Sequence, residues 1–340
     1  MRNLVIIFSI VCLAVGITSC GSRKNVASAE SALVSVGPAF IADSAYLFCQ
    51  QQCDFGPRTM NSKAHDDCEQ WIISKFTQYG MTVIPQKASL KGYDGTTLNS
   101  TNIIASFKPE LSSRVLLCAH WDSRPWADND ADEANWKKPV MAANDGASGV
   151  AVMLEVARQI DQCTKENPDS LPIGVDFICF DAEDYGFPQW ETTDDPSNTW
   201  ALGAQYWAAN LHKKAYTARF GILLDMVGGQ GAHFYQEQMS LQYARNVVDK
   251  VWKAASIVGF GSFFPNDPGV GITDDHLPVN TTAKIPCIDI IPYYPDCEAS
   301  SSVPHGILST TICPISTVPP FRLSDRLSFR CCSLRNKSYI

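Results

Sequence analysis

The stretch Cys179-Phe180-Asp181-Ala182-Glu183-Asp184-Tyr185-Gly186 decides the fold of this 340-residue chain. It continues an apolar run, residues 175–180, that passes directly into three acids. An apolar run of this length that ends in polar residues is typical of a buried strand. In α/β sheets, catalytic groups and ligands gather at the carboxyl ends of such strands. We therefore expect Glu183 and Asp184 to lie side by side at the edge of a sheet.

Two adjacent carboxylates repel each other unless a cation or a proton lies between them. A site in which one of these acids is a metal ligand and the other a general base would account for the pair. A solvated turn after a strand is the alternative, because most acid pairs are only that. The rest of the chain has to distinguish these two interpretations.

Segments with strand and helix periodicity alternate along the chain. Strands that alternate with helices are typical of a largely parallel sheet that is covered on both faces. The prediction is an α/β fold: a single domain with a central, mostly parallel mixed β-sheet and helices on both faces. The expected helices are 39–53, 64–79, 149–160, 201–211 and 244–258, and the expected strands are 81–84, 102–107, 114–119, 175–180, 220–226 and 285–291.

Candidate ligands and proton carriers recur at the ends of the expected strands. His120 and Asp122 follow one strand, Asp145 precedes a helix, Asp225 interrupts an apolar strand, and Asp274 precedes the last strand. Each has a plain alternative, such as a helix N-cap for Asp145. Their recurrence at so many strand ends favours one shared site.

These residues belong to longer motifs. The motifs are His120-Trp121-Asp122-Ser123-Arg124-Pro125-Trp126, Asn144-Asp145-Gly146-Ala147-Ser148-Gly149, Phe180-Asp181-Ala182-Glu183-Asp184, Leu223-Leu224-Asp225 and Asp274-Asp275-His276. In combination, they resemble the zinc exopeptidase superfamily. More narrowly, the chain resembles the bacterial branch of the glutaminyl cyclases, the glutaminyl-peptide cyclotransferases. The segment Asp274-Asp275-His276 is the feature that the aminopeptidase relatives lack.

The resemblance implies one zinc ion per chain and a peptide or protein substrate with an N-terminal glutamine. The glutamine would be cyclised to pyroglutamate with release of ammonia. A zinc aminopeptidase of the same fold is the alternative activity. Carried over by position, Asp145 and Asp184 match zinc ligands, Glu183 matches the general acid/base, Asp225 and Asp274 match acids that share protons with it, and Trp190 matches an aromatic of the substrate pocket.

The resemblance breaks off where the third zinc ligand is expected. In the family this ligand is a histidine in a Trp-His-Thr motif soon after the last strand. Pro292-Tyr293-Tyr294-Pro295 matches the lead-in, but residues 302–340 are rich in Ser, Pro and Cys and contain four arginines and one lysine against the single acid Asp325. His305 lies close to the lost position and is the candidate replacement ligand. An exposed loop histidine is the alternative.

A frameshift near codon 302 would explain this change. Residues 302–308 can be encoded so that a frame two bases later reads Gly-Pro-Thr-Trp-His-Thr. We therefore expect 36–301 to be the catalytic domain and 302–340 to be an aberrant basic tail. An inactive, frameshifted remnant is then a further alternative to an active enzyme.

The N-terminus has the pattern of a bacterial lipoprotein. Arg2 precedes an apolar core, residues 4–17, and Ile17-Thr18-Ser19-Cys20 resembles a lipobox. Such a core is too short for a stable spanning helix. We expect a signal peptide over 1–20, lipidation at Cys20 and a tether over 21–35, with a plain secretory signal as the alternative. The enzyme would be anchored by lipid to the bacterial cell envelope, facing the periplasm or the outside.

The composition excludes one class of partner. The net charge is −8, which argues against nucleic acid. After the N-terminal segment, no apolar stretch is long enough to span a bilayer.

Overall fold

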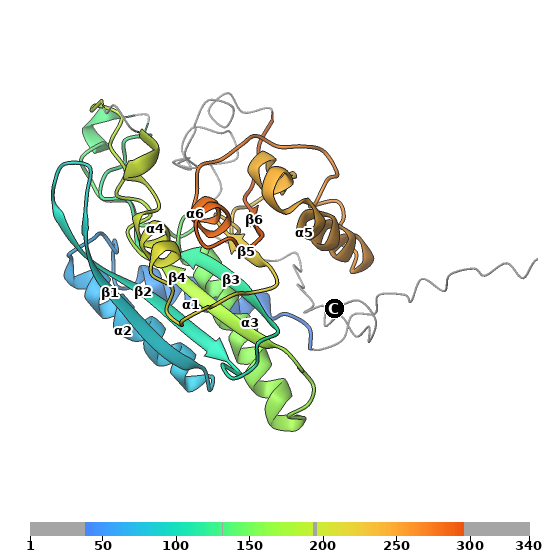
Figure 1. The fold of residues 1–340 in the computed structure, drawn as a ribbon. Coiled ribbons are helices and arrows are strands. Elements are labelled where there is room, and N and C mark those ends of the chain that lie inside the picture. The colour runs from blue at the N-terminus through green and yellow to red at the C-terminus, as the bar shows by residue number, and fades with distance from the viewer. Residues whose placement is uncertain (1–37, 131, 193–195, 296–340) are drawn as a thin grey trace, which may run out of the picture. The chain divides into compact units, whose positions relative to one another are not determined.

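Among the described residues, six strands form one mixed sheet in the order β1-β2-β4-β3-β5-β6 (Figure 1). The structure is a computed structural model that describes residues 38–130, 132–192 and 196–295. The strands are β1 Thr82–Lys91, β2 Thr97–Phe107, β3 Arg114–His120, β4 Gly174–Phe180, β5 Gly221–Leu224 and β6 Cys287–Ile290.

The strand directions bring the expected site residues to one edge. β1 and β2 form an antiparallel hairpin, and β2 also runs antiparallel to β4. β3 runs parallel to both β4 and β5, and β5 runs parallel to β6. The loops that follow β3, β4 and β5 therefore leave the sheet on the same side. The predicted fold class is confirmed.

Helices cover both faces of the sheet. Successive side chains along a strand point to opposite faces, so apolar residues have to be buried on both sides. Ile103 and Ala105 of β2 belong to one core cluster, whereas Ile104 between them belongs to the other. The first cluster contains residues of α1 Ala42–Cys53, α2 Lys63–Gln78, α3 Ala147–Glu166 and α5 Gln238–Ile257, and the second contains residues of α4 Leu202–Ala209 and α6 His276–Thr281. Two 3-10 turns, η1 Glu133–Asn135 and η2 Pro196–Thr199, lie in the long loops.

The structure differs from the expected elements mainly in the first hairpin and near the last helix. β1 and β2 are longer than the apolar segments 81–84 and 102–107, and β1 shows no buried residue. The added residues are mostly polar and carry no hydrophobic period, so the sequence pattern missed them. Gly95 has φ +81 in the turn of this hairpin. The short helix α6, which begins at His276, was not predicted either.

Parts of the expected organisation lie outside the described residues. These are the signal peptide 1–20 with Cys20, the tether 21–35, and the tail 302–340 with His305. Within the described part of the chain, no helix has the length and apolar character needed to cross a membrane.

Candidate active site

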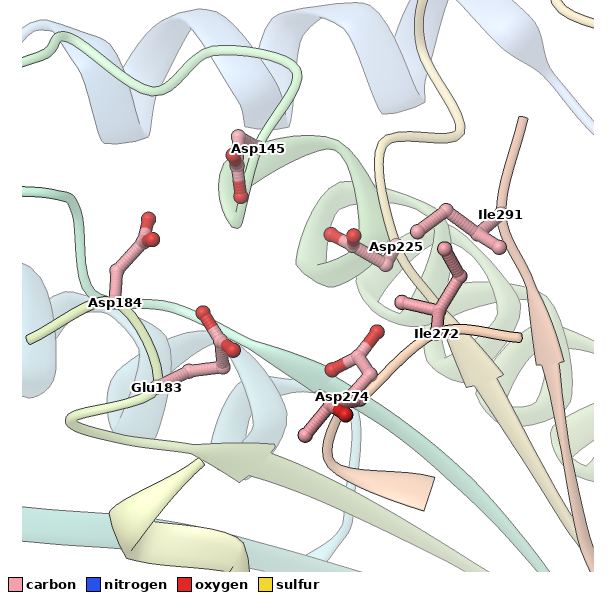
Figure 2. Close-up of a pocket in the computed structure, with 8 residues that line it drawn as sticks. Asp145, Glu183, Asp184, Asp225, Ile272, Asp274 and Ile291 are labelled. Carbon is pink, nitrogen blue, oxygen red and sulfur yellow. The ribbon is translucent and has the colours of Figure 1, made fainter. Parts of the chain in front are cut away.

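Acidic side chains from four segments converge on one pocket at the carboxyl edge of the sheet (Figure 2). Glu183 and Asp184 follow β4, Asp225 follows β5, and Asp145 lies just before α3. Asp274 reaches the same space from the loop before α6. The lining residues are Asp145, Glu183, Asp184, Asp225, Ile272, Thr273, Asp274 and Ile291. Five residues that the sequence singled out, from four separate segments, therefore share one pocket.

A sharp turn after β4 presents the Glu183–Asp184 pair. Ala182 has φ +52, in the left-handed region that costs a non-glycine residue roughly 1 kcal/mol or more. The carboxylate of Asp122 holds the next two residues. The backbone N–H of Glu183 donates to Asp122 Oδ1 at 3.1 Å, and the backbone N–H of Asp184 donates to Asp122 Oδ2 at 3.2 Å. One fully buried aspartate after β3 thus fixes the backbone of both acids.

The start of the same turn is held from β2 and α4. The backbone N–H of Thr101 donates to Asp181 Oδ2 at 2.6 Å, and the backbone N–H of Asp181 donates to Asn102 Oδ1 at 3.1 Å. The N–H of Gly203 donates to the Asp181 carbonyl at 3.0 Å. A Cβ at Gly203 would lie 2.1 Å from that carbonyl oxygen, so this close approach requires glycine.

The loop that presents Asp145 is held by a buried arginine. The Arg58 guanidinium donates from Nη1 to the carbonyl of Met141 at 2.9 Å and from Nη2 to that of Ala142 at 2.7 Å. Gly146 has φ +87, and a Cβ there would lie 2.7 Å from the Asp122 carbonyl oxygen. Asp145 is therefore placed by a loop that packs directly on the end of β3.

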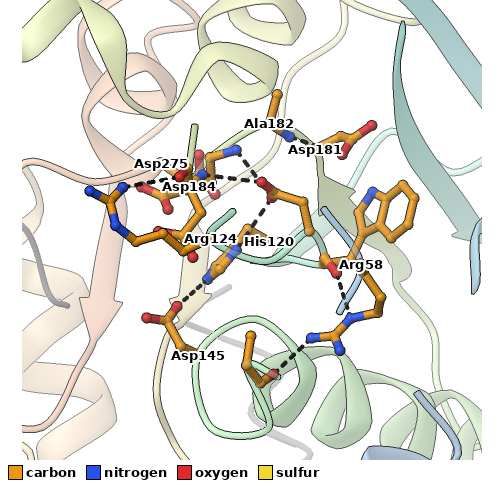
Figure 3. Close-up of polar contacts among 12 residues, drawn as sticks. Arg58, His120, Arg124, Asp145, Asp181, Ala182, Asp184 and Asp275 are labelled. Atoms are coloured by element: carbon orange, nitrogen blue, oxygen red, sulfur yellow. Dashed lines mark hydrogen bonds and ion pairs between the residues drawn. The ribbon is translucent and has the colours of Figure 1, made fainter. Parts of the chain in front are cut away.

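His120 is the basic group among these acids (Figure 3). Its Nε2 lies 2.8 Å from Asp145 Oδ1 and 3.4 Å from Asp225 Oδ1, and its Nδ1 lies 3.4 Å from Asp122 Oδ1. Burial opposes the charged imidazole, but the interactions with these three carboxylates raise the pKa of His120 well above its usual value.

Burial and mutual repulsion raise the pKa values of Glu183, Asp184, Asp225 and Asp274. Burial, reinforced by the neighbouring charge of Asp184, raises the pKa of Glu183 well above its usual value. Burial also raises the pKa of Asp184 strongly, that of Asp225 to about 7, and that of Asp274. A bound cation would relieve this repulsion and favour the ionised forms.

The donor set fits a divalent metal. Both carboxylate oxygens of Asp184 are buried and have no hydrogen-bond partner among the described residues. Potential ligand atoms of Asp184, His120 and Glu183 lie within 4.8 Å of one another. The same holds for a second set, His120, Asp145 and Asp225. Oxygen and imidazole donors of this kind suit zinc.

Trp190 lies apart from the acids. It is 37% exposed and contacts the rings of Trp126 and Trp136, rather than lining the acidic pocket. His305 and Cys20 cannot be placed because they lie outside the described residues.

Sequence reasoning missed the residues that support the site from a distance. Arg58 and His65 are buried, at 0% and 1% exposure, yet neither belongs to a strand-end motif. Asn102 stood inside an apolar strand without a functional signal. Only the tertiary structure brings them to the turn and to the Asp145 loop.

The α/β sheet and the acidic pocket at its carboxyl edge are the features expected of a zinc exopeptidase-like protein. The chain belongs to peptidase family M28, whose model matches residues 102–306. No curated protein matches it.

Solved structures agree with this assignment. The glutaminyl cyclase of Bacteroides thetaiotaomicron, bound to N-acetylhistamine, is 49% identical over 77% of this chain and 87% of its own, with a TM-score of 0.74. The glutaminyl cyclase of Tannerella forsythia is 48% identical over 77% of this chain and 88% of its own, with a TM-score of 0.73. A Zn-dependent exopeptidase of Parabacteroides distasonis is 49% identical over 78% of this chain and 88% of its own, with a TM-score of 0.74.

Proposed function

We propose that this chain is a zinc-dependent glutaminyl cyclase, a glutaminyl-peptide cyclotransferase. It converts the N-terminal glutamine of peptides or proteins to pyroglutamate and releases ammonia. The observation that carries the proposal is the Glu183–Asp184 pair, which is buried at the end of β4 and held by Asp122. The similarity to solved glutaminyl cyclases supports it.

Glu183 is the general acid and base. It accepts a proton from the attacking α-amine and delivers a proton to the departing ammonia. Burial, reinforced by the charge of Asp184, raises the pKa of Glu183, and an upward shift is the direction that lets a carboxyl work as an acid as well as a base. Such a group typically contributes about 10²–10⁴-fold in rate. Because the amine belongs to the same glutamine residue as the amide, the ring closure is intramolecular and needs no external nucleophile.

Asp225 and Asp274 share protons with Glu183. Both line the same pocket, and burial raises the pKa of each. A protonated carboxyl beside Glu183 can donate a hydrogen bond to it and stabilise its ionised form. Glu183, Asp225 and Asp274 are therefore the proposed catalytic acids.

One zinc ion per chain would be held by Asp145 and Asp184, with His305 as the candidate third ligand. The unpartnered oxygens of Asp184 support this assignment. When bound, zinc supplies Lewis-acid polarisation of the glutamine amide carbonyl. Trp190 is the proposed aromatic contact for the substrate.

Ammonia release tests the activity. Purified protein loaded with zinc should release ammonia from a peptide with N-terminal glutamine, and Glu183→Gln should lower kcat by about 10²–10⁴-fold. The matched control is Glu166→Gln, an exposed glutamate at the end of α3, which should retain full activity. Zinc-loaded protein that releases no ammonia would contradict the proposal.

A zinc aminopeptidase is the second candidate. The close group of His120, Asp145 and Asp225 offers a further set of metal donors, as a two-metal site would need. Release of a free amino acid from the same peptide, without ammonia, would favour it. Zinc content near zero together with neither activity would favour the inactive remnant.

The net charge of −8 argues against a nucleic-acid partner. At the N-terminus, Cys20 would carry the lipid that anchors the protein to the cell envelope, facing the periplasm or outside. Incorporation of labelled palmitate, and its loss in Cys20→Ser, tests the anchor.

The DNA sequence around codon 302 tests the frameshift, since only certain codons can yield the shifted Trp-His-Thr peptide.

A further inference from the structure

Two free cysteines lie one helical turn apart at the end of α1. Cys49 is buried, and Cys53, the last residue of the helix, is half-buried. Side chains at positions i and i+4 share one face of a helix, and the two thiols are joined by a hydrogen bond. Neither residue lines the acidic pocket. The proposed catalytic chemistry therefore leaves this dithiol pair without a role.

The dithiol pair touches the loop that presents Asp145, which spans residues 141–146. Cys49 Sγ donates to the carbonyl oxygen of Ala143 at 3.1 Å, and the two preceding carbonyls accept from Arg58. Consecutive carbonyls of this loop are thus held by donors from outside it. The S–H of Cys49 has two acceptors within reach, the Ala143 carbonyl and the Cys53 sulfur.

Cys53 is the reactive member of the pair. The hydrogen bond from Cys49, together with the charge and hydrogen bond of Arg58, lowers the pKa of Cys53 to about 7. Burial and the charge of Asp54 oppose this shift. The hydrogen bond with Cys53, reinforced by burial, raises the pKa of Cys49. Reactive cysteines are partly exposed and lie beside a cation that favours the thiolate, and Cys53 meets both conditions.

Two further cysteines lack this combination. Cys68 on α2 is 0% exposed, and burial raises its pKa to about 12. Cys163 on α3 is half-buried like Cys53, but burial and the charge of Glu166 raise its pKa. Cys163 is therefore the matched comparison for Cys53.

We propose that Cys49 and Cys53 form a modification site that reacts with small disulfides and closes to a disulfide, which loosens the Asp145 loop. The Cys53 thiolate attacks one sulfur of the small disulfide, forms a mixed disulfide and expels one thiolate. Cys49 then loses its proton to solvent, attacks the Cys53 sulfur and expels the second thiolate. The small disulfide is reduced to two thiols by the two electrons that the cysteine pair gives up.

The disulfide changes both the helix end and the loop. Cβ atoms at i and i+4 lie about 5–6 Å apart in a helix, whereas a disulfide needs about 3.5–4.5 Å. The shift falls on the last turn of α1, because Cys53 ends the helix and the chain turns at Gly56, where φ is +96. In the disulfide, Cys49 has no S–H, so the Ala143 carbonyl loses its donor. A bond formed under such strain is readily reduced again.

Peptide mapping after exposure to glutathione disulfide tests the site. With the reduced full-length protein at pH 7, Cys53 should be consumed at least about 3-fold faster than Cys163, because its larger thiolate fraction outweighs its lower intrinsic nucleophilicity. The product should be a Cys49–Cys53 disulfide, and Cys49→Ser should stop at the mixed disulfide on Cys53. Equal consumption of Cys53 and Cys163, or a Cys53–Cys68 disulfide, would overturn the inference.

Hydrogen exchange tests the effect on the loop. Amides of residues 141–146 should exchange faster in the oxidised protein than in the reduced one. Reduced Cys49→Ala, which has no donor for Ala143, should reproduce this change. Reduced Cys49→Ser is the matched control, because its hydroxyl can still donate, and it should exchange like the wild type. Unchanged exchange in the oxidised protein would refute the inference.

Zinc binding links the site to the proposed function and keeps the two separable. Oxidation should weaken zinc affinity by about 3- to 10-fold, the range that one lost hydrogen bond supplies, and reduction should restore it. Mapping and exchange need no ammonia release. If both behave as expected and no ammonia is released, the activity is wrong and the dithiol site stands. If ammonia is released and neither behaves as expected, only the dithiol inference fails.

Discussion

The imidazole of His65 on α2 lies 2.8 Å, Nε2 to Oδ1, from the carboxylate of Asp181 at the end of β4. Both side chains are buried, and the imidazole stacks on Trp121 with ring centroids 4.2 Å apart. Burial opposes the charge on His65, but Asp181 raises the pKa of the imidazole above its usual value. The pair anchors the turn that presents Glu183, so its integrity matters for the site as well as for the core.

His65→Phe should destabilise the protein by about 3–5 kcal/mol, because it leaves the buried carboxylate of Asp181 without its basic partner. Urea unfolding at pH 7 measures the loss. The double variant His65→Phe/Asp181→Asn should recover part of it, since the uncompensated charge is then removed.

Asp66→Asn is the matched control. Asp66 lies 3.9 Å from the other ring nitrogen of His65, but its side chain is 76% exposed, and exposed ion pairs contribute about 1 kcal/mol or less. A loss in Asp66→Asn as large as that in His65→Phe would show that the Asp181 pairing is not what matters.

Zinc removal should abolish ammonia release and lower the melting temperature. A ligand that binds only the folded state stabilises it by mass action, and removing it reverses the effect. Dialysis against a chelator, followed by zinc addition, measures both quantities.

Asp184→Asn should weaken zinc affinity by about 100-fold or more. Removing a residue that only orients a ligand already costs up to about 100-fold, and removing the ligand itself should cost at least as much. Asp169→Asn, an exposed aspartate after α3, should leave zinc content unchanged. Full zinc content and affinity in Asp184→Asn would exclude Asp184 as a ligand.

Glu237 should make stability depend on acid pH. Burial opposes its charge, but the hydrogen bond and charge of His276 and the groups of Met239 and Ser240 outweigh burial and lower the pKa of Glu237 to about 2. A carboxyl whose folded pKa lies below its unfolded pKa stabilises the protein above the unfolded pKa. That contribution, about 3 kcal/mol here, is lost as the pH falls from about 4.5 towards 2.

The comparison of wild type with Glu237→Gln isolates this contribution. The difference in unfolding free energy should be full at pH 6–7 and should shrink steadily below about pH 4.5. Glu166→Gln, which changes an exposed glutamate at the end of α3, is the matched control. A Glu237→Gln difference that stays constant down to pH 3 would rule out the low folded pKa.

Gly203→Ala should damage both stability and activity. A Cβ there would lie 2.1 Å from the Asp181 carbonyl oxygen and 2.6 Å from Asn102 Oδ1, so the backbone of the turn has to move. Overpacking of this kind costs about 1–3 kcal/mol. Thermal unfolding and kcat measure the two effects. Gly261→Ala, where the nearest atom is 3.4 Å away, is the control, and equal losses in both variants would contradict the tight contact.

Local patterns in the sequence were sufficient to predict the α/β class and the acids that line the pocket. The apolar run of β4 followed by Glu183 and Asp184, and the acids at the ends of β3 and β5, are local patterns. A strand and the residue that follows it are contiguous in the chain. Burial periodicity therefore predicts where such residues emerge from a parallel sheet.

The contacts that hold those acids, and the groups beside them, follow only from the tertiary structure. The contact between His65 and Asp181 joins positions 116 residues apart, and the bonds from Glu183 and Asp184 to Asp122 span 61 and 62 residues. The ring contacts of Trp126 with Tyr93 and Tyr185 join the loop after β3 to the β1–β2 hairpin and to the loop after β4. A buried polar partner leaves no period in the sequence, because its position is set by the packing of distant elements and by the cost of burying a charge unpaired.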